Sequence, residues 1–305
     1  MIVLTIGKFE SIHLGHRALL TEVVTEAHKL GLQSAAMVFT PHPYIFFGDS
    51  NYAPMFTESE RNELIERIGI STILSPSFDE KFVKMLAEEF CKMLFVQYNA
   101  KVVIVGEDYR FGKERAGNVE RLKQEAQKYG ANVKVMPAVH GLKDAEISTS
   151  NIRKLLTEGN MADANRQLGF SFFISGVVTH GKQLGRTIGF PTLNIYPDSN
   201  KLLPPDGVYS TQTTVNGTVY NSITNIGLRP TVEDDTKKVR SVETHLFEYS
   251  GNEIYGAHVK IELLDFIRPE RKFSSLDELK TQIAKDSNYA SDISKSTIPS
   301  LKPFS

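Results

Sequence analysis

The sequence predicts an α/β protein with two domains: an N-terminal doubly wound parallel sheet and a C-terminal small antiparallel β-barrel that ends in a helix. The chain has 305 residues, and a domain commonly holds roughly 100–200 residues. Strand-like and helix-like segments alternate in the first half, which is typical of a parallel sheet covered on both faces. From residue 172 onward the apolar segments are short and separated by turns, which favours a barrel.

The elements of the first half follow from the apolar runs and their period. Short runs rich in Val, Ile and Ala predict strands at 2–6, 34–39, 72–74, 101–106 and 132–136. Helical periodicity predicts helices at 14–30, which ends before Gly31, and at 61–68, 79–98 and 119–129. The segment 79–98 carries an apolar stripe of Phe82, Leu86, Phe90 and Leu94. This stripe predicts one long amphipathic helix.

The elements of the second half are shorter. Residues 148–168 are expected to form one or two helices that close the first domain. The strands are predicted at 172–178, 207–215, 218–226, 240–247 and 258–266, and the last helix at 276–285. These segments predict a first domain at 1–158, a helical linker at 159–169, a barrel domain at 170–291 and a loose tail at 292–305.

Composition argues against several classes of protein. The chain has 35 Lys and Arg against 36 Asp and Glu, so neither nucleic acid nor a membrane is expected as a partner. No apolar run approaches the ~18 residues of a membrane-spanning helix, and no secretory signal is visible. A cytoplasmic location is therefore expected, and no obligate protein partner is visible. The one cysteine, Cys91, lies among apolar residues and is expected to be a buried structural thiol.

The first candidate site lies between the first strand and the first helix. The loop from Gly7 to His16 would place backbone N–H groups at the mouth of the sheet, where unpaired donors at a helix N-terminus bind anions. His13 and His16 are three residues apart and share one side of the first turn. Gly15 leaves room for a phosphate, and two imidazoles can donate to phosphate oxygens. Two surface histidines beside a turn are the alternative, but the strand–loop–helix context favours a site.

Two further segments of the first half suit the same site. Ser148 and Thr149 can cap a helix, and Arg153, one turn later, can reach an anion at that helix end. Simple capping is the alternative for the two hydroxyls. Residues 41–43, Pro-His-Pro, predict a loop at the carboxyl edge of the sheet, where ligands bind in open α/β folds.

The second candidate site begins with a glycine-rich segment that differs from a Walker A loop. Its glycines and interleaved cations are Gly181, Lys182, Gly185, Arg186 and Gly189. In the extended segment that follows, Thr192 and Asn194 share one face. A hydroxyl and an amide oxygen suit a hard cation such as Mg²⁺, whereas the alternative is the polar face of an edge strand.

Glu243 supplies a third element of this second site. Strand alternation puts it on one face with His245 and Phe247. A carboxylate in such a setting can accept a hydroxyl proton during phosphoryl transfer. Taken alone, Glu243 is better interpreted as an exposed strand residue.

The chain resembles the bacterial bifunctional riboflavin kinase/FAD synthetases. The first half carries the pattern Gly-x-Phe-x-x-x-His-x-Gly-His at 7–16, followed by the motifs at 105–112 and 147–153. The second half carries the motifs at 181–194, 204–209, 225–231 and 243–245. The resemblance implies phosphorylation of riboflavin to FMN by ATP with Mg²⁺. It further implies adenylylation of FMN to FAD by a second ATP, with release of pyrophosphate.

The resemblance also implies roles for individual residues. In the first half it assigns the ATP phosphates to His13 and His16 with Gly7, Phe9 and Gly15, a second phosphate clamp to Ser148, Ser150 and Arg153, and a nucleotide or flavin contact to Asp108. In the second half it assigns ATP binding to Gly181, Lys182, Gly185, Arg186 and Gly189, Mg²⁺ to Thr192 and Asn194, the catalytic base to Glu243, and flavin or nucleotide contacts to Gly207, Tyr209 and Arg229.

The chain departs from the family pattern at two positions. Glu10 and Ser11 stand where the family usually has Asp and Gly. If position 11 needs a positive φ, Ser11 stores strain there, and a weakened adenylylation is expected. The double change Glu10→Asp with Ser11→Gly would then raise its rate.

Other functions remain as alternatives. His-x-Gly-His serves many acceptors, so a cytidylyltransferase or another adenylyltransferase is a rival, which the kinase-like second half disfavours. The chain could keep only one of the two activities or act as a flavin-binding regulator. Nucleic-acid binding by the barrel is disfavoured by the net charge of −1.

Overall fold

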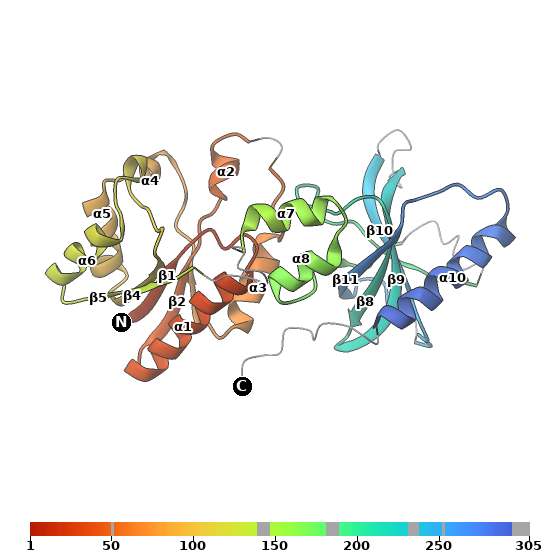
Figure 1. The fold of residues 1–305 in the computed structure, drawn as a ribbon, viewed down its shortest axis with the longest axis horizontal. Helices are drawn as coiled ribbons and strands as arrows, with labels where there is room; N and C mark the ends of the chain where they lie inside the picture. The colour runs from red at the N-terminus through yellow and green to blue at the C-terminus, as the bar shows by residue number, and fades with distance from the viewer. Residues whose placement is uncertain (50–51, 139–146, 181–188, 231–237, 252–253, 295–305) are drawn as a thin grey trace. The chain divides into compact units, whose positions relative to one another are not determined.

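The computed structural model describes residues 1–49, 52–138, 147–180, 189–230, 238–251 and 254–294. Contacts between Cα atoms divide these residues into two compact units, 1–149 and 150 onward. The first unit is a parallel α/β sheet and the second an antiparallel barrel with a C-terminal helix (Figure 1). The predicted fold class is confirmed, and the domain limits at 158 and 170 stay predictions.

The first unit is built on a five-stranded sheet in the order β3-β2-β1-β4-β5, with every strand pair parallel. The strands are β1 (Ile2–Ile6), β2 (Gln33–Met37), β3 (Thr72–Leu74), β4 (Ala100–Gly106) and β5 (Asn132–Met136). The chain leaves β1 toward β2 and β3 on one side and returns to β4 and β5 on the other. The strand order therefore reverses between β1 and β4, and ligands of open α/β sheets bind at the carboxyl ends of the strands at such a point.

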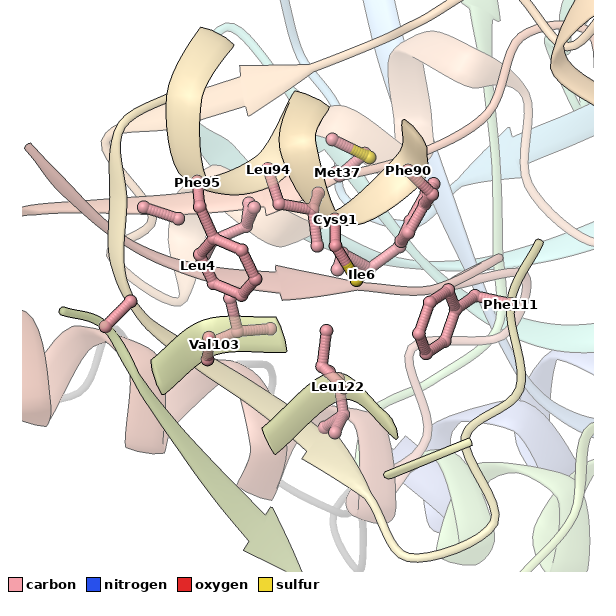
Figure 2. Packing of buried hydrophobic residues seen from close by; sticks show 14 of the residues in the cluster. Leu4, Ile6, Met37, Phe90, Cys91, Leu94, Phe95, Val103, Phe111 and Leu122 are labelled. Carbon is pink, nitrogen blue, oxygen red and sulfur yellow. The ribbon is translucent and has the colours of Figure 1, made fainter. Parts of the chain in front are cut away.

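Helices cover both faces of this sheet. They are α1 (Leu14–Leu30), α2 (Pro43–Phe46), α3 (Glu58–Arg67), α4 (Glu80–Lys84), α5 (Ala87–Lys92) with a π-turn η1 (Met93–Gln97), a 3₁₀ turn η2 (Lys113–Arg115) and α6 (Val119–Lys128). Figure 1 shows α5 and α6 on one side of the sheet and α1 and α3 on the other. On the α5–α6 side, Leu4, Val103 and Leu122 pack with Phe90 and Cys91 (Figure 2).

Cys91 is fully buried in this cluster, as predicted for a structural thiol. Burial raises the pKa of its thiol to about 12. The thiol is thus protonated at neutral pH and a poor nucleophile.

The predicted single helix over 79–98 is wrong, because the chain breaks between α4 and α5. Met85 and Leu86 adopt extended backbone angles there. Lys113 N donates to Met85 O at 2.7 Å, and Gly112 packs against Ala87 so closely that a Cβ would lie 3.0 Å from its backbone. The first residue of η2 therefore takes the carbonyl that a continuous helix would use. Leu86, expected on the apolar stripe, is 55% exposed.

The second unit begins with α7 (Thr149–Thr157, of which Thr149 belongs to the first unit) and α8 (Met161–Leu168). Asn165 fastens α8 to the barrel, since its amide donates to Leu263 O at 2.8 Å and accepts from Phe172 N at 2.7 Å. The barrel strands are β6 (Phe173–Val177), β7 (Leu193–Ile195), β8 (Gly207–Val215), β9 (Thr218–Pro230), β10 (Lys238–Leu246) and β11 (His258–Arg268).

The barrel sheet has the order β6-β11-β8-β9-β10-β7, and its strand pairs are antiparallel. Its two edges nearly meet, because Thr179 N donates to Asn194 O at 2.8 Å. The helix α10 (Leu276–Ser294) packs on β8, β9 and β11 and runs nine residues past the predicted end at 285. Within the described ranges, no helix is long and apolar enough to cross a membrane.

Candidate active sites

The loop between β1 and α1 is tight. Phe9 and Ile12 are fully buried and both have a φ of +46°. The ring of Phe9 lies so close to Gly7 that a Cβ there would be 2.9 Å from it. Gly7 is thus needed for this close approach.

Ser11 does not carry the strain that the sequence predicted. The positive φ angles fall on Phe9 and Ile12, and Ser11 is not among the residues with positive φ. The Ser11 hydroxyl is instead buried and hydrogen-bonded to the Thr149 hydroxyl at 3.0 Å. This contact joins the loop to the first residue of α7, so the strain argument for a weakened first site is wrong.

His13 is the N-cap of α1. Its Nδ1 accepts from Gly15 N at 3.1 Å and from His16 N at 3.3 Å. Two of the helix N–H groups that we expected to be open for an anion are therefore used by the imidazole. Because Nδ1 accepts, the neutral ring carries its proton on Nε2. The donor that His13 can offer to a phosphate is this Nε2–H.

His13 and His16 form one aromatic stack. Their ring centroids lie 3.9 Å apart at an interplanar angle of 16°, and the edge of Phe9 meets His16 at 5.3 Å. Burial lowers the pKa of His13 to about 4, outweighing a backbone hydrogen bond that raises it. Burial, and then the neighbouring His13, lower the pKa of His16 well below its ordinary value. Both imidazoles are therefore expected to be neutral at pH 7, so that they can bind phosphate as hydrogen-bond donors rather than as cations.

Asp108 lies where the sheet topology places a ligand crevice. It follows β4, the neighbour of β1, and its exposed carboxylate would lie 3.1 Å from a Cβ at Gly106. The position agrees with the predicted nucleotide or flavin contact. Ser148 precedes α7, whereas Ser150 and Arg153 belong to the second unit, and the clamp that these three would form stays a prediction.

An aromatic group that the sequence did not predict lies at the carboxyl end of β2. His42 caps α2 and stacks on Tyr52 at 4.7 Å and 14°, with Tyr44 at 5.3 Å from His42. Lys8 Nζ lies 4.2 Å from the Tyr44 ring, a cation–π contact. The Pro-His-Pro run predicted the loop, but the tyrosines carried no signal of their own.

The second site is a row of polar residues across three strands. In the antiparallel ladders, Glu243 of β10 lies opposite Asn194 of β7 and opposite Asn225 of β9. Such directly opposed residues have Cβ atoms roughly 5 Å apart. The ladder thus brings the predicted base beside a predicted metal ligand, and all three side chains carry hard oxygen donors that fit Mg²⁺.

Arg229 of β9 joins this row to Glu270. Its Nε donates to Glu243 Oε1 at 3.3 Å, and its Nη2 donates to Glu270 Oε1 at 3.0 Å. Burial works to lower the pKa of Arg229, but the attraction of Glu243 and Glu270 outweighs burial and raises it.

Two cavities meet beside this row, at Thr192 and His245. One of about 300 Å³ is lined by Glu243, Arg229 and Glu270 and by the apolar side chains Val208, Ile223, Leu279 and Ile283. A second of about 570 Å³ is lined by Val178, Ile254 and Tyr255. Thr192 and His245 line both cavities. The His245 ring nitrogen Nδ1 is 2.9 Å from Pro191 O, which holds the ring at the junction.

Comparison with known proteins identifies the family. The family model of FAD synthetase matches residues 1–151, and that of riboflavin kinase matches residues 168–294. The bifunctional riboflavin kinase/FMN adenylyltransferase of Bacillus subtilis (strain 168) is 35% identical over 290 residues, which cover 94% of this chain and 91% of the relative. That of Escherichia coli (strain K12) is 37% identical over 288 residues, covering 93% and 90%.

The chain belongs to the bifunctional riboflavin kinase/FMN adenylyltransferase family. The crystal structure of a protein named macrolide-efflux protein, from Streptococcus pneumoniae, has the same fold. It superposes with a TM-score of 0.84 at 28% identity and covers 95% of this chain and 94% of that one. The words "macrolide-efflux" belong to the name of that protein and are not carried over to this chain.

Several predicted residues of the second half remain to be placed in the structure. Gly189 is exposed with a φ of +86°, whereas Gly181, Lys182, Gly185 and Arg186 lie outside the described residues. Tyr209 is fully buried, and its hydroxyl donates to Pro205 O. At Gly207 a Cβ would lie 2.5 Å from Arg268 O. The geometry gives Gly207 and Tyr209 packing roles, and their predicted ligand contacts stay predictions.

Glu270, Asn225 and His245 also line the smaller cavity, and none of them was predicted as a site residue. Glu270 lies in a loop after β11, and only the folded barrel brings it to Arg229. Asn225 was visible in the 225–231 motif, and His245 shares a face with Glu243, so both had a signal. Arg268 pairs with the buried Asp286 at 2.8 Å along the wall of the smaller cavity, a pairing of strand and α10 that no local pattern encodes.

Proposed function

We propose that the chain phosphorylates riboflavin to FMN in the barrel and adenylylates FMN to FAD in the parallel-sheet unit, using one ATP for each step. The observation that carries the proposal is that each family-matched half keeps its own polar site. The first half holds the stacked His13 and His16 at the strand-order reversal, and the barrel holds Glu243 between Asn194 and Asn225.

In the kinase step, the smaller cavity suits the flavin. Its apolar walls from β8, β9 and α10 fit an isoalloxazine ring, and the polar row at one end fits the ribityl chain. The larger cavity suits ATP, and the shared Thr192 marks the junction at which the γ-phosphate meets the ribityl 5′-hydroxyl. Gly181, Lys182, Gly185, Arg186 and Gly189 are proposed to bind the phosphates.

Glu243 acts as the general base of this step. It accepts the proton of the 5′-hydroxyl while that oxygen attacks the γ-phosphorus, and the bond to the β-phosphate oxygen breaks to release ADP. Thr192 and Asn194 would hold Mg²⁺, which when bound neutralises phosphate charge. Arg229 contacts one oxygen of Glu243 and orients the carboxylate.

In the adenylylation step, the FMN phosphate attacks the α-phosphorus of ATP and pyrophosphate leaves. The Nε2–H of His13 donates to the phosphates as charge develops, and His16, stacked on it, is proposed to do the same. Gly7, Phe9 and Gly15 shape the loop. We further propose that nucleotide or flavin phosphate is held by Asp108, Ser148, Ser150 and Arg153.

A cytoplasmic location of the protein also remains a prediction.

The test is to incubate the protein with ATP, Mg²⁺ and either riboflavin or FMN, and to separate riboflavin, FMN and FAD by chromatography. Appearance of FMN and then FAD supports the proposal. FMN without FAD would leave a kinase alone, and neither product would leave a flavin-binding protein. CTP in place of ATP, with FMN as acceptor, tests the cytidylyltransferase alternative.

A further inference from the structure

Glu270 is held over one face of β9. Its Oε1 accepts from Asn225 Nδ2 at 2.8 Å and from Arg229 Nη2 at 3.0 Å. Between these two residues lies Gly227, where a Cβ would be only 2.4 Å from the same oxygen. Residues 225, 227 and 229 share a strand face. The glycine therefore leaves the space that the carboxylate fills.

Arg229 is held at each of its nitrogen groups. Nε contacts Glu243, Nη2 contacts Glu270, and Nη1 donates to Leu228 O at 3.3 Å. Only Oε1 of Glu243 is engaged in this way, which leaves Oε2 without a hydrogen-bond partner among the described residues. The side chains of Arg229, Glu243 and Glu270 are 32–37% exposed, so these ion pairs contribute little to stability. Their fixed geometry points to a different role.

We propose that Glu270 is a positioning residue for the kinase step. By holding Nη2, it keeps Arg229 on a single oxygen of Glu243 and leaves Oε2 to accept the proton of the ribityl hydroxyl. A guanidinium prefers to grip a carboxylate through two parallel hydrogen bonds. Without Glu270, Arg229 can turn its fork onto both oxygens of Glu243 and block the base. The inference rests on the proposed function of Glu243.

The proposal differs from a flavin contact by Glu270, which also lines the cavity. A flavin contact would act mainly on the KM for riboflavin. A positioning role acts on kcat, because riboflavin still binds while the base is blocked. A positioning role also makes the effect of Glu270 on kcat depend on whether the side chain at position 229 is the forked guanidinium of Arg or the single-point cation of Lys.

The experiment measures kcat and KM for riboflavin phosphorylation in the full chain, with Tm as the control of folding and FAD formation from FMN as the control that the other unit is unaffected. In Glu270→Ala we expect kcat to fall at least about tenfold with KM changed less, since a misplaced catalytic group can cost ~10²-fold. Glu270→Gln keeps an acceptor oxygen and should stay closer to the wild type. Asp277→Asn, an exposed carboxylate of α10 that lines neither cavity, is the matched control.

Two further variants test the geometry. Gly227→Ala keeps every charge but pushes the Glu270 carboxylate away, so it should reproduce the kcat loss. Arg229→Lys in the Glu270→Ala background replaces the fork with a single-point cation and should recover part of the lost kcat. If Glu270→Ala is poorly folded, the comparison of Glu270→Gln with Gly227→Ala decides.

The proposal is overturned by an unchanged kcat in Glu270→Ala, by a rise in KM alone, or by a deeper loss when Arg229→Lys is added. A wild-type protein that makes no FMN would instead refute the proposed kinase function, so the two failures are distinguishable.

Discussion

Replacing Glu243 by Gln tests the catalytic base with little change of shape. The amide oxygen of Gln can still accept from Arg229 Nε, as Oε1 of Glu243 does at 3.3 Å. The amide cannot take up a proton at neutral pH, so the rate of FMN formation should fall by ~10²–10⁴-fold. FAD formation from supplied FMN should be unchanged, because it belongs to the other unit.

The structure also limits the side effects of this change. The Arg229–Glu243 pair is about one-third exposed, so losing its charge should cost at most about 1 kcal/mol. For a unit of about 150 residues this is a Tm shift of ~2–4 °C. The assay compares initial rates of FMN and FAD formation by chromatography, with Tm measured on the same samples. FMN formation near the wild-type rate would refute the role of Glu243, and a much larger fall in Tm would refute the assumption of an intact fold.

Three further changes test the first site. His16→Ala should let FMN accumulate while FAD formation falls by ~10²-fold, whereas equal loss of both activities would contradict a role confined to this site. The pKa of His13, lowered to about 4, means that the unfolded chain binds more protons than the folded one between about pH 6.5 and pH 4. Stability should therefore be lost as pH falls through this window, and His13→Asn, which can still cap α1, should reduce the fall in Tm between pH 7 and pH 5. Ser11→Gly removes the 3.0 Å contact with Thr149 and should slow adenylylation roughly fivefold, for a bond worth about 1 kcal/mol. Thr149→Ser keeps both hydroxyls as its control, and a faster Ser11→Gly would restore the view that glycine suits this loop better.

Much of the fold was predictable because it is encoded locally. Apolar runs and their period gave the parallel strands and the change to short barrel strands. The break in 79–98 was not predictable, because it depends on Lys113 binding Met85 O across the fold. Local periodicity cannot register a carbonyl taken by a distant loop.

The candidate sites were also predictable only in part, namely where a local pattern encodes them. Strand alternation predicted Thr192 and Asn194 on one face, and this stays a prediction, whereas the pairing of Asn194 with Glu243 requires the long-range register of β7 and β10. The helical spacing of His13 and His16 was readable, yet the capping role of His13 was not. A histidine at an N-cap competes for the same N–H groups that an anion would use. The interpretation of Ser11 failed because the chain places its positive φ angles at Phe9 and Ile12.

In both candidate sites one polar atom of the key side chain is held by a neighbouring group, which leaves the other atom for a ligand. In the first, two backbone N–H groups occupy Nδ1 of His13, and the proton is thereby held on Nε2. In the second, Arg229 holds Oε1 of Glu243, and Oε2 remains for the hydroxyl proton. A side chain with two polar atoms becomes directional when a neighbour takes one of them. Substitutions that keep the held atom, such as Glu243→Gln, should therefore preserve the local fold and remove the chemistry. Glu270→Ala, which frees the residue that holds Glu243, should leave the reactive group present and misdirect it.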